Sequence, residues 1–354
     1  MIVVKSYSEG SRGEWDSFVL SSPSSSLFHL TAWKDSVEKA FGHKPHYIMA
    51  VRDEEIRGVL PLFEVKSRLF GHALTSVPFG VYGGVSALDQ EASKTLARSA
   101  EALARAIGVD YLELRNDSPQ ASGDKEEGPL SSPPSPWHSK DLYVTFRRPI
   151  YETVEKNMEA IPRKQRRMIR QGQKELSSAI GRTELLEEFY RIYARNVRDL
   201  GSPVFPFSFF SALMENFQDS FILSITKGGK MVAGVFTFVF RDTVMPYYGA
   251  GLREYFEYAV NDFMYWELMR WGCENGYKVF DFGRSKKETG SFHFKRHWGF
   301  EPEGLDYRFY LVNAREMPNV SPVNPKYRLF INVWKRLPFP VANWLGPKLV
   351  RGIP

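Results

Sequence analysis

The sequence predicts a fold of mixed α-helices and β-strands (α/β or α+β), built from two copies of one unit. Two passages read alike, HYIMAVRDEEIRGVLPLFEV at 46–65 and SFILSITKGGKMVAGVFTFVF at 220–240. After each passage the chain has a glycine-containing segment, then a helical pattern, then another strand pattern. Because the same order of elements occurs twice at similar spacing, we infer that one α/β unit has been duplicated.

Each repeated passage is predicted to be a β-hairpin, because two strand-like runs flank a polar turn. In the second passage the turn is KGGK at 227–230, and Gly234 takes the place that Gly58 has in the first. The glycine-containing segments that follow are FGVYGGV at 79–85 and YYGAGL at 247–252.

A helix with an apolar stripe is predicted after each glycine-containing segment. The first helix ends at Gly108 and the second at Asn275-Gly276, as is typical of helix ends. The stripe of the first helix consists of Leu96, Ala100, Leu103, Ala104 and Ile107. One face of the second helix carries Tyr258, Asp262, Tyr265, Trp266, Met269 and Cys273. The strands VDYLELR (109–115) and YKVFDFG (277–283) follow, and each copy is expected to close on an aromatic strand, 142–148 or 305–311.

These elements place the first domain at 1–150, the second at 151–315 and a C-terminal tail at 316–354. Residues 116–139 are rich in Ser, Pro and Gly, so we expect a mobile loop inside the first domain rather than a linker between domains. A central cleft between the two copies is the natural place for a ligand.

The composition is that of a folded protein of about two domains, with 354 residues, 43% hydrophobic residues and 25% charged residues. The single cysteine, Cys273, excludes an internal disulfide and fits a reducing cytoplasm. The N-terminus lacks the apolar region of a secretory signal, and no apolar run is long enough to span a bilayer. The net charge of +6 favours partners that carry phosphate or anionic lipid.

Basic charge gathers in IPRKQRRMIRQGQK at 161–174, which contains no acidic residue. On a helix, positions 163, 167, 170 and 174 share one face. A solvated helix surface is the alternative, but such surfaces usually mix charges of both signs. Arginine suits phosphate oxygens, so we expect a phosphate site for a nucleotide sugar, a lipid diphosphate or a tRNA backbone. The residues expected to bind phosphate are Arg163, Lys164, Arg167 and Arg170.

The tail at 324–354 is also basic and contains no acidic residue. Its cations alternate with aromatic and aliphatic residues, among them Trp334 and Trp344. One interpretation is a segment that lies on an anionic membrane surface. The other is a tail that packs onto the first domain.

The duplicated unit, the basic helix, FDFGRSK at 280–286 and FHFKRHWGF at 292–300 together resemble the FemAB-like family. The resemblance implies two tandem GNAT-like acyltransferase domains. Enzymes of this family attach amino acids from aminoacyl-tRNA to peptidoglycan precursors. The chain has the short form, which is similar to relatives associated with exosortase and exopolysaccharide systems.

The family's Phe-Lys pair matches Phe294-Lys295, and the resemblance implies that this lysine holds the reacting ester carbonyl. Aminolysis of an ester passes through a tetrahedral oxyanion, which a cation in a partly dehydrated pocket stabilises better than a cation in water. Phe292, Phe294 and Trp298 are suited to exclude water, and Phe294 is expected to contact substrate. The alternative is that Lys295 is a surface lysine on a strand beside core aromatic residues.

The base that receives the amine proton is less clearly indicated. Asp281 is the first candidate, because it lies in a strand where the parallel strands of this fold commonly separate. Its alternative role is to pair only with Arg284 or Lys286. Glu113 is the equivalent but weaker candidate in the first copy, and solvent or substrate is a further alternative.

Other chemistry is less well supported. His293 and His297 are spaced like metal ligands on a helix, but the segment reads as strand or loop and no third ligand is evident, so no metal is expected. Cys273 lies on an aromatic helix face, as a buried structural thiol does. The stretch YYGAGLREY (247–255) lacks the Arg/Gln-x-x-Gly-x-Gly/Ala order of acetyl-CoA enzymes, which weakens an acyl-CoA donor.

The expected function is a FemAB-type N-acyltransferase that moves an aminoacyl or acyl group to an amine of a peptidoglycan, exopolysaccharide or other cell-envelope precursor. No cofactor is expected to be bound; the donor is aminoacyl-tRNA or acyl-CoA as a co-substrate. Tyr248 and Asn261 are expected to line the cleft. The alternatives are an acyl-CoA-dependent N-acetyltransferase and a non-catalytic scaffold that binds a membrane surface or nucleic acid. The expected location is the cytoplasm, with peripheral contact to the inner face of the membrane through 324–354.

Overall fold

The computed structural model describes residues 1–117, 137–318 and 325–353. Their contacts divide the chain into two units. The first contains Met1–Tyr143, Gly304–Asn319 and Arg351–Pro354, and the second contains Val144–Glu303 and Val320–Val350. Most of the loop expected at 116–139 lies outside the described residues, and its last three residues form a strand instead.

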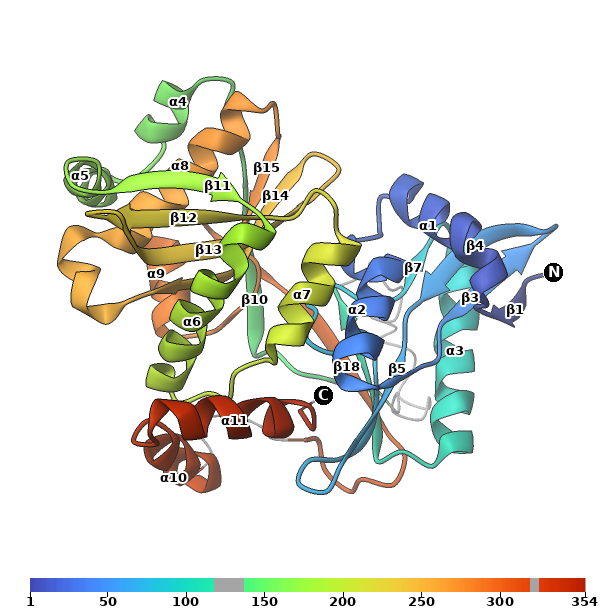
Figure 1. The fold of residues 1–354 in the computed structure, drawn as a ribbon. Helices are drawn as coiled ribbons and strands as arrows, with labels where there is room; N and C mark the ends of the chain where they lie inside the picture. The colour runs from blue at the N-terminus through green and yellow to red at the C-terminus, as the bar shows by residue number, and fades with distance from the viewer. Residues whose placement is uncertain (118–136, 319–324, 354) are drawn as a thin grey trace, which may run out of the picture. The chain divides into compact units, whose positions relative to one another are not determined.

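The first unit has two sheets, a four-stranded one in the order β1-β3-β4-β7 and a six-stranded one in the order β2-β5-β6-β8-β18-β9. The helix α3 packs against β3 and β4 (Figure 1). The helices of this unit are α1 (Arg12–Ser21), α2 (Thr31–Phe41) and α3 (Gln90–Ile107). The strands are β1 (Val3–Ser6), β2 (Lys44–Pro45), β3 (Ile48–Arg52), β4 (Glu55–Leu60), β5 (Phe63–Ser67), β6 (Gly71–Thr75), β7 (Ser86–Ala87), β8 (Tyr111–Asn116), β9 (Trp137–Ser139) and β18 (Asp306–Leu311).

The second unit has one sheet in the order β11-β12-β13-β14-β15-β10-β16, with β17 paired to β10. Both α6 and α8 pack against β12, β13 and β14 (Figure 1). The strands are β10 (Tyr143–Pro149), β11 (Ser177–Gly181), β12 (Phe221–Lys227), β13 (Lys230–Phe240), β14 (Thr243–Gly251), β15 (Val279–Asp281), β16 (Ser285–Lys286) and β17 (Pro302–Gly304). The helices are α4 (Val154–Glu159), α5 (Arg163–Gly172), α6 (Thr183–Leu200), α7 (Phe207–Asn216), α8 (Val260–Glu274), α9 (Gly290–His297), α10 (Pro325–Trp334) and α11 (Phe339–Val350).

The repeat expected from the sequence is present in the strand pairing. In the first unit β6 runs parallel to β8, and in the second β14 runs parallel to β15. The β12–β13 turn has positive φ at both Gly228 and Gly229, which is why two glycines stand there. The helix α3 ends at Gly108, and α8 ends just before Asn275, as expected.

The closing strands do not follow the expected domain bounds of 1–150 and 151–315. The strand β10 pairs antiparallel with β15 and so belongs to the second unit. The strand β18 pairs antiparallel with β8 and so belongs to the first unit. Both strands carry aromatic residues, which indicate that a strand is partly buried but do not identify its neighbour.

Most of the tail packs on the second unit, while Arg351 lies against Gly42 and His43 of the first unit. The guanidinium of Arg198 in α6 donates to the carbonyl oxygen of Leu337 at 3.2 Å. Gly346 in α11 lies so close to Val204 that a Cβ would meet the Val204 backbone nitrogen at 2.8 Å. The side chains of Lys326 and Arg328 lie outside those that are described.

Candidate functional site

The strands β14 and β15 separate in the second unit, as expected near Asp281. Their parallel register covers only Thr243 with Val279 and Val244 with Phe280. The strand β14 then continues to Gly251, while β15 stops at Asp281. In open α/β sheets the carboxyl ends of separating parallel strands are where ligands bind. The segment just after β15 is therefore the first place to look for chemistry.

The segment 290–300 contains the helix α9, and the expectation that it is a strand or loop is wrong. The alternating aromatic residues Phe292 and Phe294 resemble a strand, but the side chains that turn inward are Phe292, Lys295 and Trp298. A spacing of three residues places these side chains along one side of a helix. His293 and His297 are exposed as a result.

Lys295 is buried, with 8% of its surface exposed, so it is not the surface lysine of the alternative interpretation. Its Nζ donates hydrogen bonds to the carbonyl oxygens of Gly283 at 2.8 Å and Arg284 at 3.1 Å. The rings of Phe146 and Phe282 have their centroids 5.5 and 6.0 Å from Nζ. The ammonium group therefore lies at the end of β15 between aromatic faces, and two of its three N–H groups are used.

The environment of Lys295 disfavours its charge. Burial lowers the pKa of Lys295 from 10.5 to about 7, although the negative charge of Asp281 opposes this shift. A lysine of this kind changes its charge near neutral pH, as functional lysines often do.

Asp281 is buried and its carboxylate is engaged on both oxygens. Arg147 Nε donates to Oδ2 at 2.9 Å, and the backbone N–H of Gly283 donates to Oδ1 at 2.6 Å. Asp281 forms an ion pair with Arg147, a residue of β10. Glu113, the equivalent in the first unit, accepts from Arg115 through both oxygens and from Thr75. Both carboxylates thus use both oxygens to hold backbone or arginine groups in place.

Asp262, in the first turn of α8, is a further candidate for the carboxylate that receives the amine proton. Its Oδ1 accepts the indole N–H of Trp298 at 2.9 Å, which ties it to the residue three places after Lys295. Burial raises the pKa of Asp262 to about 6, while the indole hydrogen bond and the cation of Lys164 oppose the rise. In the sequence, Asp262 is the acidic residue on a helix face that otherwise carries aromatic, methionine and cysteine side chains.

Phe294 belongs to a cluster of aromatic rings that also contains Tyr265, Phe282 and Trp298. Its ring centroid lies 5.6 Å from that of Tyr265 and 6.1 Å from that of Trp298. Phe282 lies 5.9 Å from Trp298 and also contacts the Lys295 ammonium. The rings described next to the Lys295 ammonium are those of Phe146 and Phe282.

The expected phosphate-binding residues are brought together on α5. Arg163, Lys164, Arg167 and Arg170 are all exposed, and no ion pair holds them within the part of the chain that the structure describes. The opposite face of α5 packs on α8, where a Cβ on Gly172 would lie 2.6 Å from the Cβ of Phe263. One face of α5 is therefore packed against α8, and its cations face solvent. The charge of Lys164 lowers the pKa of Asp262.

Tyr248 and Asn261 are not equivalent. Tyr248 is buried among rings of α6, α7 and β13, with centroids 5.0 Å from Phe210 and 5.9 Å from Tyr193. Its hydroxyl is buried with no hydrogen-bond partner among the described residues. Asn261 is half-buried beside Asp262, with its Oδ1 3.0 Å from the position of a Cβ on Gly251. Asn261 adjoins the candidate site, whereas Tyr248 is a core residue.

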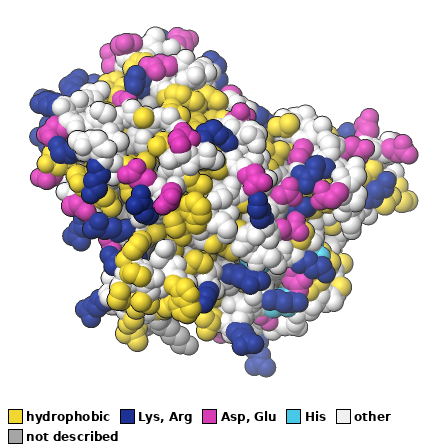
Figure 2. All heavy atoms as spheres, in the orientation of Figure 1, with side chains coloured by type: hydrophobic (Ala, Val, Ile, Leu, Met, Phe, Trp, Pro, Cys, Tyr) yellow, Lys and Arg dark blue, Asp and Glu magenta, His cyan; other side chains and the backbone are white. Residues whose placement is uncertain are grey.

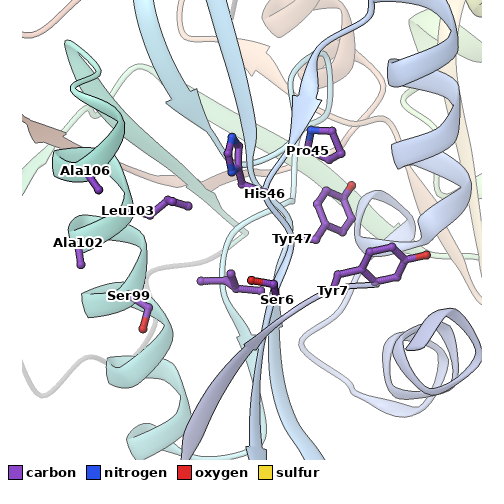
Figure 3. A pocket seen from close by; sticks show the side chains of 10 residues that line it. Ser6, Tyr7, Pro45, His46, Tyr47, Ser99, Ala102, Leu103 and Ala106 are labelled. Atoms are coloured by element: carbon purple, nitrogen blue, oxygen red, sulfur yellow. The ribbon is translucent and has the colours of Figure 1, made fainter. Parts of the chain in front are cut away.

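A pocket of about 500 Å³ lies in the first unit and contains none of the expected site residues. Figure 3 shows its lining from α3 on one side and from β1 and the 45–48 segment on the other. His46, the imidazole in this lining, is already 3.3 Å from Glu64. The pocket offers no lysine or arginine, so we do not assign the chemistry to it.

Two further properties concern the described residues as a whole. No group of three or more His, Cys, Asp or Glu side chains is arranged to hold a metal ion among the residues searched. No helix in the described ranges is long and apolar enough to cross a membrane.

Comparison with known proteins identifies the fold of both units. The family model described as "Acetyltransferase (GNAT) domain" matches residues 156–296. The crystal structure of FemX is similar with a TM-score of 0.69 and 17% identity, covering 93% of this chain and 100% of that one. A tandem GNAT protein from the clavulanic acid biosynthesis pathway has a TM-score of 0.54 and 9% identity, covering 89% of this chain and 100% of that one.

A third solved structure is the C-terminal domain of a putative lysylphosphatidylglycerol synthetase from Agrobacterium fabrum. Its TM-score is 0.58 at 11% identity, and the match covers 85% of this chain and 92% of that one. No curated protein matches the sequence. The tandem GNAT-like fold and the FemAB-like resemblance expected from the sequence are confirmed.

Proposed function

The chain is an acyltransferase of tandem GNAT-like fold that resembles the FemAB-like family, and from this premise we propose its reaction. It transfers an aminoacyl or acyl group to an amine of a phosphate-bearing cell-envelope precursor, of peptidoglycan or of exopolysaccharide, at the cytoplasmic side. The observation that carries the proposal is the buried ammonium of Lys295 at the point where β14 and β15 have separated.

Lys295 stabilises the negative charge that develops during transfer. The amine nitrogen attacks the carbonyl carbon of the donor ester or thioester, and the carbonyl electron pair moves onto oxygen. Two N–H groups of the ammonium bind the carbonyl oxygens of Gly283 and Arg284, and the third donates a hydrogen bond to this oxyanion. A cation among rings acts at low dielectric, and one donor of this type contributes roughly 3–4 kcal/mol to lowering a barrier.

The proton released by the attacking amine goes to Asp262 rather than to Asp281. Asp281 already holds Arg147 and the Gly283 amide, whereas Asp262 has one oxygen held by Trp298 and a raised pKa of about 6. A carboxylate with this pKa is mostly ionised at neutral pH and still accepts a proton effectively. When the intermediate collapses, the C=O bond re-forms, the bond to the leaving oxygen or sulfur breaks, and the proton passes to that atom.

The cations of α5 bind the phosphate groups of the precursor or of the donor. Arg163, Lys164, Arg167 and Arg170 are exposed on one helix, and guanidinium and ammonium groups suit phosphate oxygens. A tRNA backbone and a lipid or nucleotide diphosphate share this chemistry. The favoured donor is aminoacyl-tRNA, since the sequence lacks the usual glycine order of acetyl-CoA enzymes.

An acyl-CoA donor is the second candidate, because the matched family model describes acetyltransferases. An assay with purified protein, an amine-bearing nucleotide-sugar or lipid-linked precursor and either labelled aminoacyl-tRNA or labelled acetyl-CoA separates the two donors. We expect label to move to the precursor amine from aminoacyl-tRNA. Transfer from acetyl-CoA alone selects the second candidate, and transfer from neither donor contradicts the proposed function.

A further inference from the structure

The two helices at the end of the chain, α10 and α11, present opposite faces to the protein and to solvent. We call them the C-terminal helix pair. Their inner face is buried: Trp334 is 3% exposed, and Ala342, Gly346 and Val350 follow at spacings of four. The pair is also held by Arg198 through the Leu337 carbonyl and by Tyr190 through Asn343. The helix pair is therefore fixed to the second unit along one side.

The outer face is apolar although it is exposed. Leu329 is 69% exposed and Trp344 is 64% exposed. The set of large hydrophobic residues exposed on this face is Leu329, Phe330, Val333, Val341 and Trp344. Figure 2 shows hydrophobic side chains gathered over the region where Figure 1 places α10 and α11. A continuous exposed apolar surface of this kind usually marks a surface that docks on something.

The charge on the helix pair itself has one sign. The last acidic residue of the chain is Glu316, and no acidic residue follows it. Lys335, Arg336 and Lys348 are exposed on or beside the two helices. Lys348 Nζ lies 3.5 Å from the centroid of the Trp344 ring, so a cation and an aromatic group share one place on the surface. Tryptophan and lysine together are typical of groups that lie at a membrane–water interface.

We propose that the outer face of the C-terminal helix pair docks on a bilayer surface that contains anionic lipid. The apolar side chains enter the boundary between headgroups and acyl chains, and the cations lie against lipid phosphates. The length and polarity of the described helices suit a segment that lies on a membrane rather than one that crosses it. This inference does not depend on the acyl-transfer proposal.

The same observations disfavour the other occupants of this face. A second copy docked on the same face would bring cations against cations, which opposes self-association. Nucleic acid would use the cations, but phosphate binding does not require five exposed hydrophobic residues, and the Trp344 ring is already covered by Lys348. An anionic bilayer satisfies the apolar side chains and the charges together.

The test is sedimentation of the full-length protein with vesicles, one set of phosphatidylcholine alone and one with about a third phosphatidylglycerol. The apolar variant is Leu329→Ser/Val333→Ser/Trp344→Ser, and the charge variant is Lys335→Gln/Arg336→Gln/Lys348→Gln. The matched control is Leu20→Ser/Leu69→Ser, which removes apolar residues that are exposed on the first unit. Melting temperatures of all variants are measured to confirm that each is folded.

We expect the wild type and the control to bind the anionic vesicles equally. The apolar variant should lose at least about tenfold in affinity for them. The charge variant should lose the preference for anionic over neutral vesicles. The proposal is overturned if the wild type does not sediment with anionic vesicles or if the folded apolar variant sediments like the wild type. Binding to an oligonucleotide but not to vesicles, or concentration-dependent dimerisation abolished by the apolar variant, likewise overturns it.

Discussion

The Nζ of Lys295 donates a hydrogen bond to the carbonyl oxygen of Gly283 at 2.8 Å. This contact joins α9 to the turn at the end of β15, where Gly283 has a φ of 67°. Lys295 therefore has two roles that can be measured separately. Its N–H groups hold the backbone of the turn, and its charge is available to a reaction.

Replacing Lys295 by methionine tests the structural role. Lys295→Met keeps the length of the side chain but leaves two buried carbonyl groups without their donor, so we expect a loss of roughly 1–3 kcal/mol in unfolding free energy. The pKa of Lys295 is about 7 in the folded chain and near 10.5 when unfolded, so the unfolded chain binds more protons between these values. Wild-type stability should therefore gain from a rise in pH across this window, and the variant should lack that gain. Urea unfolding at several pH values measures both effects; identical pH dependence in the two proteins would contradict the burial of this charge.

The pH dependence of transfer tests Asp262. Activity should rise with pH near 6 as Asp262 ionises and fall above about 7 as Lys295 loses its charge. Asp262→Asn keeps the acceptor for the Trp298 indole, so it should fold normally, lower kcat by roughly 10²–10³-fold and remove the limb near pH 6. The exposed acid Asp219 offers a control, Asp219→Asn, that should leave the profile unchanged. A wild-type profile in Asp262→Asn would show that the proton goes elsewhere.

The cations of α5 should affect binding more than turnover. We expect Arg167→Gln/Arg170→Gln to raise KM for the phosphate-bearing substrate by about tenfold or more with little change in kcat. Wild-type KM should rise with salt, and the double variant should show a shallower salt dependence. Arg191→Gln is the control, because Arg191 is an exposed arginine on α6 of the same unit. Equal KM values for the double variant, the control and the wild type would show that the cations of α5 do not bind substrate and form only a solvated surface.

Tyr248 distinguishes a core residue from a site residue. Its hydroxyl is buried without a described partner, so Tyr248→Phe removes a group that gains nothing from burial. The variant should be as stable as the wild type or more stable by up to about 1 kcal/mol, with unchanged activity. Thermal unfolding and the transfer assay measure the two quantities. A Tyr248→Phe variant that loses activity but keeps a normal melting temperature would show that Tyr248 belongs to the substrate site.

Local sequence signals predicted the repeated hairpins and the helix ends well, because turns such as Gly228-Gly229 and caps such as Gly108 are set by neighbouring residues. The partners of β10 and β18 were not predictable in this way, since strand pairing joins residues far apart in the chain. The helix α9 was missed because Phe292 and Phe294 alternate like a strand, while burial at a spacing of three decides the structure. The role proposed for Asp262 could not be predicted from the sequence, because Trp298 lies 36 residues away in the chain and only the fold brings the two side chains together.

The most direct test of the catalytic role of Lys295 is the transfer rate of Lys295→Gln at saturating substrate. Glutamine keeps N–H donors, one bond nearer the backbone than the lysine nitrogen, but carries no charge, so it removes the cation while retaining a hydrogen-bonding group. We predict a folded protein whose kcat is lower by roughly 10²–10³-fold, the loss expected when an oxyanion loses its charged donor. A folded Lys295→Gln variant that turns over at the wild-type rate would contradict the account.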